Sequence, residues 1–256
     1  MQDEPFIQFV HVWKSFGDQP VLEDVSFDVR RGETLAVLGR SGVGKSVTLK
    51  HILGFLEPDE GEVWVAGRQV AQMTEAELAE MRRRVTMVFQ SGALFDSLTV
   101  GENVAYPLRE RALREPDGLD EDAIQECVQQ LLGLVELEDV GNLLPSGLST
   151  GMKRAVAIAR ALAAAPEAIL YDEPTTMVDP LMAHTVGDLI LKLKRKRGLT
   201  SVVVTHDVRL AKKLADRVVF LADGRVAYFG PMREIDSCPD PLIKEFVELD
   251  EISLEQ

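Results

Sequence analysis

One eight-residue segment constrains the fold of this chain more than any other: residues 39–46 read Gly-Arg-Ser-Gly-Val-Gly-Lys-Ser. They fit the pattern G-x-x-x-x-G-K-[S/T] of a phosphate-binding loop. A short apolar run, residues 34–38, comes directly before the segment, and a helical stretch, residues 47–53, follows it. A buried strand, a glycine-rich loop and a helix in this order predict an α/β fold that binds a nucleotide at the loop.

The residue types in this loop suit phosphate chemistry. Glycines let backbone N–H groups wrap closely around phosphates, and the following helix adds its positive N-terminal end. A lysine in this position would reach the β- and γ-phosphates, and the serine hydroxyl would bind Mg²⁺. We therefore expect a nucleotide with Mg²⁺ to be held by Gly39, Arg40, Ser41, Gly42, Val43, Gly44, Lys45 and Ser46.

A second site of acidic side chains follows another apolar run, residues 168–173, which read Ala-Ile-Leu-Tyr-Asp-Glu. Open α/β sheets bind ligands at the carboxyl ends of their strands, so this site and the glycine-rich loop should meet there. Asp172 would hold Mg²⁺ through water, and Glu173 would orient and polarise an attacking water. An apolar strand that ends in two acids is by itself commonly a strand that meets a solvated loop. The glycine-rich loop is what favours the functional interpretation.

The order of patterns predicts one domain with an insertion, which suits a length of 256 residues. We expect an N-terminal antiparallel β subdomain and a mostly parallel core, together residues 1–98 and 166–237, and a helical insertion over residues 99–165. Residues 238–256 form a tail with Leu242, Phe246 and Leu249 at helical spacing. A helix packed on its own domain is favoured for the tail; docking to a second protomer or an accessory subunit is the alternative.

Charge and composition exclude several classes of protein. The 28 Lys and Arg against 42 Asp and Glu give a net charge of −14, which argues against a broad nucleic-acid-binding surface. No uncharged apolar run approaches the ~20 residues that a membrane-spanning helix needs, and the acidic N-terminus does not resemble a signal peptide. Two distant cysteines, Cys127 and Cys238, form no disulfide framework, so we expect the reducing cytoplasm.

Further motifs appear in the order typical of one family, and over nearly its full length the chain resembles the ATP-binding-cassette (ABC) ATPases. Residues 148–152, Leu-Ser-Thr-Gly-Met, match the signature motif of that family. The resemblance implies ATP as the nucleotide. It also implies four roles: Gln90 contacts Mg²⁺ and the attacking water, Asp179 joins two protomers, His206 lies near the γ-phosphate, and Phe16 stacks on adenine. For Phe16, a place in the hydrophobic core is the alternative.

The signature motif implies a second copy of the chain. Ser149 would be the N-cap of a helix whose free N–H groups form an anion site, while Lys45 already serves the phosphates in its own chain. In the family, two protomers pair head to tail, and Ser149 and Gly151 of one close on the γ-phosphate held by the other. Thr150 departs from the family's usual glycine, and residues 177–178, Met-Val, depart from its usual small residue and Leu.

Three segments resemble the cassettes of Mce-associated lipid transporters, the Mla type: residues 88–100, 151–154 and 171–176. This resemblance implies an ATPase for phospholipid or other hydrophobic cargo, peripheral on the cytoplasmic face of an inner membrane. Its permease would dock beside Gln90 and residues 93–95, with an Mce-domain protein and a small regulatory subunit as further candidate partners. Leu94 and Phe95 suit this docking; a buried loop anchor is the alternative.

Two other functions stay open. The first is an importer ATPase for another cargo, such as an amino acid, a metal or a lipoprotein. The second is an ABC ATPase that acts on ribosomes or DNA without a permease. Proteins of that second kind usually carry two cassettes or long coiled-coil insertions and a basic surface. The single cassette, the short insertion and the charge of −14 therefore disfavour it.

Overall fold

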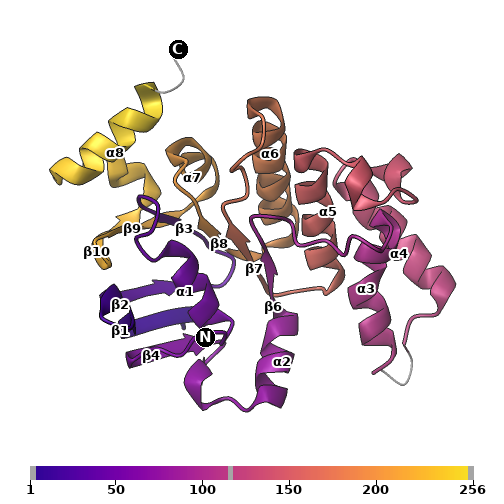
Figure 1. The fold of residues 1–256 in the computed structure, drawn as a ribbon, viewed down its shortest axis with the longest axis horizontal. Coiled ribbons are helices and arrows are strands. Elements are labelled where there is room, and N and C mark those ends of the chain that lie inside the picture. The colour runs from indigo at the N-terminus through magenta and orange to yellow at the C-terminus, as the bar shows by residue number, and fades with distance from the viewer. Residues whose placement is uncertain (1–3, 115–117, 253–256) are drawn as a thin grey trace. The chain divides into compact units, whose positions relative to one another are not determined.

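The computed structural model describes residues 4–114 and 118–252, so residues 253–256 of the expected tail lie outside the described residues. The chain divides into two compact units. Unit 1 comprises residues 1–82 and 190–256, and unit 2 comprises residues 83–189. Both contain helices and strands, and the predicted α/β class is confirmed (Figure 1).

Unit 1 contains the predicted N-terminal antiparallel sheet, with strand order β2-β1-β4-β5. Its strands are β1 (Ile7–Phe16), β2 (Gln19–Val29), β4 (Glu60–Val65) and β5 (Arg68–Gln69). Phe9 of β1 lies opposite Phe27 of β2, and their rings stack with centroids 4.4 Å apart. Such cross-strand aromatic pairs stabilise a sheet and fix its register.

A second set of strands in unit 1 positions the glycine-rich loop. Its members are β3 (Thr34–Leu38), β8 (Thr200–Val204), β9 (Arg217–Ala222) and β10 (Arg225–Pro231). β3 runs parallel to both β8 and β9, and all five residues of β3 and of β8 are buried. β10 pairs antiparallel with β9 through a turn in which Asp223 and Gly224 both have positive φ, as the Asp-Gly pair predicts.

A half-buried arginine, Arg217, joins β9 to β2. The Arg217 guanidinium donates to both carboxylate oxygens of Asp28 at 3.0 and 3.1 Å and to Glu33 at 3.4 Å. It also lies over the Phe229 ring, 4.2 Å from the centroid. Burial raises the pKa of Glu33, although the Arg30 backbone N–H and Arg217 oppose that shift. Arg217 thus ties the antiparallel sheet to the strands that carry the loop.

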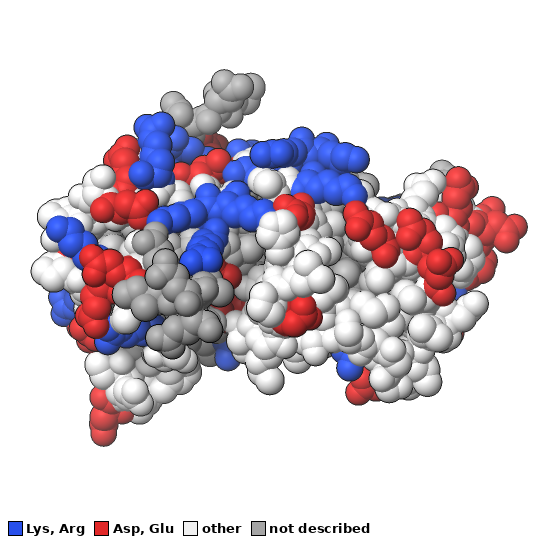
Figure 2. All heavy atoms as spheres, turned by 90° about the horizontal axis from the view of Figure 1, so that it is seen from above, with Lys and Arg blue, Asp and Glu red and all other residues white. Residues whose placement is uncertain are grey.

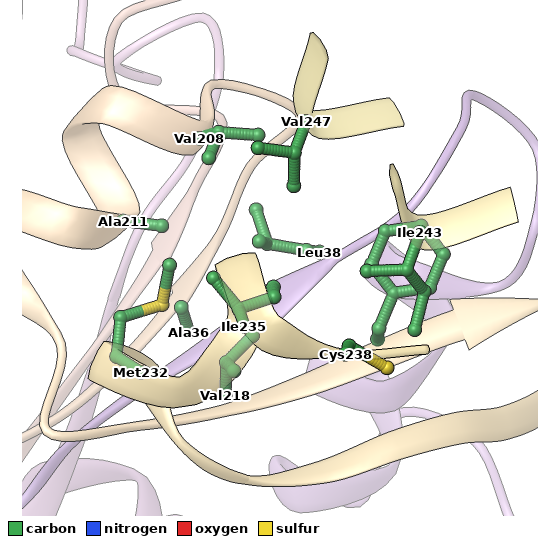
Figure 3. Close-up of a cluster of buried hydrophobic side chains, with 11 residues drawn as sticks. Ala36, Leu38, Val208, Ala211, Val218, Met232, Ile235, Cys238, Ile243 and Val247 are labelled. Carbon is green, nitrogen blue, oxygen red and sulfur yellow. The ribbon is translucent and has the colours of Figure 1, made fainter. Parts of the chain in front are cut away.

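The helices of unit 1 are α1 (Lys45–Ile52), α7 (Val208–Leu214), the 3₁₀ helices η1 (Val70–Gln72) and η4 (Met232–Ser237), and α8 (Pro241–Ile252); α2 (Glu75–Arg84) and α6 (Pro180–Arg197) have residues in both units. Three of them, α7, η4 and α8, pack around a core that includes β3. Side chains from β3, α7, η4 and α8 point toward one another in this core (Figure 3). Ile243 and Val247 of α8 are buried in it, so the tail helix packs on its own unit as expected.

Unit 2 contains the helical segment that the sequence predicts between residues 99 and 165. The parallel strands β6 (Val85–Val88) and β7 (Ala168–Asp172) flank α3 (Val100–Ala112), α4 (Glu121–Leu134), η2 (Glu138–Val140), η3 (Pro145–Gly147) and α5 (Thr150–Ala163). A capping box between Thr99 and Glu102 starts α3. α3 packs against α4 and α5, which bury their apolar faces between them.

Acidic side chains gather at one end of unit 2 (Figure 2). Figure 2 shows Asp and Glu side chains gathered at the right of the view, the end that carries α4 in Figure 1. Glu121, Asp122 and Glu126 of α4 are all exposed there. Hydrogen bonds from Arg109 and Gln125 lower the pKa of Glu121 to about 2.

No helix among the residues that the structure describes combines the length and the apolar character needed to cross a bilayer.

Candidate functional site

The glycine-rich loop leaves the end of β3 and turns directly into α1. Gly39, Gly42 and Gly44 all have positive φ. A Cβ at Gly39 would lie 2.4 Å from the Leu221 carbonyl oxygen, and one at Gly44 would lie 2.9 Å from the Val21 carbonyl oxygen. Because these neighbours are backbone atoms that cannot turn aside, only glycine fits at either position. The result is a backbone loop at the start of a helix, where N–H groups favour an anion.

Lys45 places a buried cation in the loop. Its side chain is only 6% exposed, and Nζ donates to the carbonyl oxygens of Gly39 at 2.7 Å and of Arg40 at 3.0 Å. The ammonium therefore lies against the backbone of the loop itself. A phosphate in the loop would meet this charge together with the N-terminal end of α1, whose first turn contains no acidic residue.

The other loop residues lie nearer the surface. Arg40, Ser41 and Gly42 are exposed, and Val43 and Ser46 are half-buried. Arg40 pairs with Glu245 of α8 at 3.1 Å. These residues leave the loop open to a ligand.

His206 lies at the same edge of unit 1 as the loop. β8 is the parallel neighbour of β3, and the Thr205 N–H donates to the Val37 carbonyl at 3.1 Å. His206 and Gly39, which follow these strands, therefore lie at the same carboxyl edge of the two strands. His206 is exposed, and Asp207 after it caps α7 by accepting the Leu210 N–H at 2.8 Å.

Phe16 ends β1 on the surface of unit 1. Its side chain is 49% exposed, so the alternative that it belongs to the hydrophobic core is wrong. The Lys14 ammonium lies 5.9 Å from its ring centroid. An exposed ring at the end of a strand is suited to stacking on a flat ligand.

Gln90 and Glu173 follow the two strands of unit 2. β6 and β7 are parallel, and Val88 lies opposite Tyr171. Gln90 and Glu173, each two residues further along, therefore follow the same end of the two strands. Glu173 has φ 47°, an uncommon value for a residue with a side chain. Its carboxylate accepts a hydrogen bond from the Thr176 hydroxyl at 3.0 Å. Thr176 therefore holds the Glu173 carboxylate in one orientation, a role that the sequence reading did not assign.

A buried arginine on α5 connects these strand ends. Arg154 is 3% exposed and donates to the carbonyl oxygens of Phe89 at 2.6 Å and of Thr176 at 3.5 Å. Burial lowers the pKa of Arg154, and the nearby negative charge of Asp172 opposes that shift. Its Nε is buried without a hydrogen-bond partner among the described residues. The sequence reading gave Arg154 no role, although an arginine on the apolar side of a helix is an unusual signal.

The signature segment begins α5, and Ser149 is its N-cap. The Ser149 hydroxyl accepts the Met152 N–H at 3.3 Å. Gly151 is buried, and a Cβ there would lie 2.6–2.9 Å from atoms of Met182 in α6. Gly151 is thus also required for helix packing within unit 2. Thr150, the departure from the family pattern, is exposed.

Asp179 and its neighbours form an exposed segment before α6. The Asp179 carboxylate accepts the Met182 N–H at 3.0 Å and so caps α6 within its own chain. Met177 and Leu181 on either side of it are 85% and 76% exposed. Two large apolar side chains this open to solvent are typical of a surface that another protein covers.

The loop after Gln90 is anchored by a residue that the sequence reading missed. Buried Asn103 accepts the Phe95 N–H at 2.8 Å and donates to the Phe95, Leu98 and Thr99 carbonyls. Phe95 itself is exposed, with its ring 5.0 Å from Tyr106, so it is not a buried anchor.

The predicted site residues are divided between the two units. Unit 1 holds Phe16, His206 and the loop; unit 2 holds Gln90, Ser149, Gly151, Asp172, Glu173 and Asp179.

Comparison with known proteins agrees with these motifs. Residues 22–176 match a family described as ABC transporter. A chloroplastic protein of Arabidopsis thaliana, TRIGALACTOSYLDIACYLGLYCEROL 3, is 40% identical over 92% of this chain and 71% of its own length. The intermembrane phospholipid transport system ATP-binding protein MlaF of Escherichia coli K12 is 37% identical over 91% of this chain and 84% of its own length. A methionine import ATP-binding protein, MetN of Carboxydothermus hydrogenoformans, is 38% identical over 88% of this chain and 66% of its own length.

One solved structure is closely similar in fold. It is a dimeric, post-hydrolysis state of the ATP-binding cassette MJ0796 bound to ADP and Pi. The two chains superpose with a TM-score of 0.80 and 33% sequence identity, over 89% of this chain and 99% of the other.

Proposed function

The chain belongs to the ABC transporter family, and we propose that it powers the transport of phospholipid or another hydrophobic substrate. As a member of this family it is an ABC ATPase whose hydrolysis of ATP is coupled to transport. The observation that carries the proposed cargo is that the phospholipid transport ATPase MlaF matches 91% of the chain. The methionine importer MetN matches it nearly as well, so an amino-acid cargo is the second candidate.

In the proposed reaction, the loop residues hold the phosphates of ATP. Lys45 neutralises charge that builds on the β- and γ-phosphates as the bond between the γ-phosphorus and the bridging oxygen breaks. Glu173 orients the attacking water and accepts its proton, and His206 contacts the γ-phosphate. The products are ADP and phosphate. Phe16 stacks on adenine.

Mg²⁺ fits the donor set of the proposed site. The Ser46 hydroxyl, the Asp172 carboxylate and the Gln90 amide offer oxygen atoms, which are the ligands that this ion prefers. Mg²⁺ commonly binds through one or two carboxylates and substrate phosphates and keeps several waters, so a larger acidic cluster is not required. When bound, the ion neutralises phosphate charge.

The proposed assembly is a homodimer with two shared sites. Ser149 and Gly151 at the start of α5 would contact the γ-phosphate bound by the other protomer, and Asp179 would join the two. Two observations support this. The similar cassette MJ0796 was solved as a dimer. The exposed side chains of Met177 and Leu181 flank Asp179 and would be covered in a dimer.

The proposed membrane attachment is through protein rather than lipid. The net charge of −14 opposes binding to anionic lipid headgroups, which attract basic surfaces. Exposed Phe95, in the loop after Gln90, offers an apolar contact for a permease. The chain would then lie on the cytoplasmic face of an inner membrane, with an Mce-domain protein and a small regulatory subunit as further partners.

The proposed cargo is tested by purifying the tagged chain from membranes of its own cell with its partners attached. We expect a multi-spanning permease, an Mce-domain protein and bound phospholipid, identified by mass spectrometry. We also expect ATP hydrolysis by the complex to respond to added phospholipid and not to methionine. A permease with an amino-acid-binding protein would show the second candidate to be correct. Ribosomes in place of a permease would contradict both.

A further inference from the structure

The strand end that carries Phe16 is supported by strands on one edge only. β1 pairs with β2 as far as Phe16, which lies opposite Gln19. On its other edge β1 pairs with β4, and within the described residues that pairing ends where Trp13 lies opposite Glu60. On this edge the backbone groups of residues 14–16 have no strand partner within the described part of the chain and are open to solvent or to a side chain.

Asp59, the residue just before β4, supplies a partner on this edge. Its backbone N–H donates to the Trp13 carbonyl at 2.9 Å. One carboxylate oxygen accepts the Ser15 N–H at 2.6 Å, and the other accepts the Lys14 ammonium at 2.6 Å. The hydrogen bonds from Lys14 and from the Ser15 backbone hold the pKa of Asp59 below its usual range. Asp59 thus takes the place of β4 as the hydrogen-bond partner of the last residues of β1.

The same carboxylate also fixes the cation beside the Phe16 ring. The Lys14 side chain is only 16% exposed, and its ammonium pairs with Asp59 and lies 5.9 Å from the centroid of the Phe16 ring. A cation at this distance from an aromatic ring is attracted to it. Asp59 therefore restrains both the backbone before Phe16 and the group that lies by its ring, while the ring keeps about half of its surface open.

We propose that Asp59 is a positioning residue for recognition of the nucleotide base, acting through Lys14 and Ser15 to hold the Phe16 ring ready to stack. The inference rests on the proposed stacking role of Phe16. Holding a binding group in its bound geometry increases affinity, because less conformational entropy is lost when the ligand arrives. Loss of Asp59 should weaken contacts with the base and leave contacts with the phosphates unchanged.

The test compares two ligands that share phosphates but differ in the base. Dissociation constants of ATP and of inorganic tripolyphosphate, each with Mg²⁺, are measured for the full chain by calorimetry. The variants are Phe16→Ala, Asp59→Ala, Asp59→Asn and, as a control, Glu60→Gln, which removes one negative charge from the adjacent exposed position. Tripolyphosphate binding also reports whether each variant keeps a folded phosphate loop.

We expect Phe16→Ala to weaken ATP binding about tenfold, the scale of one base–aromatic stack, and Asp59→Ala to weaken it about three- to fivefold. Asp59→Asn should weaken ATP binding less than Asp59→Ala does, because its amide oxygen still accepts the Ser15 N–H. Tripolyphosphate affinity should change by less than about twofold in every variant, and Glu60→Gln should match the wild type with both ligands.

The outcomes separate the inference from the function on which it rests. If Phe16→Ala leaves ATP affinity unchanged, the stacking role is wrong. If Phe16→Ala weakens ATP binding but Asp59→Ala does not, Asp59 is not a positioning residue. Equal losses of ATP and tripolyphosphate affinity in Asp59→Ala, or an equal effect of Glu60→Gln on ATP, would likewise overturn the inference.

Discussion

Replacing Glu173 by glutamine should lower the rate of ATP hydrolysis by about 10²–10⁴-fold, the usual contribution of a general base, while ATP still binds. Glutamine keeps the size of the side chain and can still accept a hydrogen bond from Thr176, which lies 3.0 Å from the Glu173 carboxylate. It cannot accept the proton of the attacking water. The loss should therefore appear in kcat and not in the dissociation constant of ATP.

The measurement is phosphate release under steady state, with ATP affinity measured separately. Thr176→Val is the graded comparison, because it removes the hydroxyl that orients Glu173 but keeps the carboxylate. It should slow hydrolysis by less than Glu173→Gln does. Wild-type turnover in Glu173→Gln would show that Glu173 is not the general base.

Replacing Lys45 by alanine should weaken ATP binding by about 10²-fold, since hydrogen bonds to charged groups contribute about 1.5–3 kcal/mol each. Lys45 is the buried cation of the loop, and its ammonium lies against the carbonyls of Gly39 and Arg40. Its removal takes away the charge that the phosphates would meet there and leaves those two carbonyls without this donor. Hydrolysis should fall at every ATP concentration that can be reached.

The matched control for this prediction lies on the same helix. Lys50 is an exposed lysine in the last turn of α1, so Lys50→Ala removes the same charge about one and a half turns away from the loop. Calorimetry with ATP and Mg²⁺ should show near wild-type affinity for Lys50→Ala. Equal losses in the two variants would mean that the general charge of the helix, and not the place of Lys45, determines binding.

Local patterns predicted much of the fold because they are set by neighbours in the sequence. The apolar run of residues 34–38 forms the expected buried strand, β3, and the Asp223-Gly224 pair forms the turn that such a pair favours. It was harder to predict which face of the tail helix is buried. Leu242 and Phe246 form one apolar stripe of α8 and Ile243 and Val247 another, and the sequence does not say which is buried. The core around β3 buries Ile243 and Val247 fully, Leu242 and Phe246 pack against it partly buried, and Leu249 is left exposed.

Two of the residues that the sequence did not reveal act on distant parts of the chain. Arg154 on α5 contacts carbonyls 65 and 22 residues away, and Asp59 contacts Lys14 across 45 residues. Asn103 resembles any polar residue of a helix until its bonds to the loop before α3 are seen. Motifs carry the residues proposed to touch ATP, whereas residues that position them become visible only when the chain is folded.

We propose that each ATP is shared between two copies of this chain, which bind it through the loop of one and the helix start at Ser149 of the other. The most direct measurement is the mass of the Glu173→Gln variant in solution by light scattering, with ATP and Mg²⁺ and with ADP and Mg²⁺. Slowed hydrolysis should trap the shared state, so we expect a dimer with ATP and a monomer with ADP. A monomer with saturating ATP, from a variant that binds ATP normally, would contradict the claim.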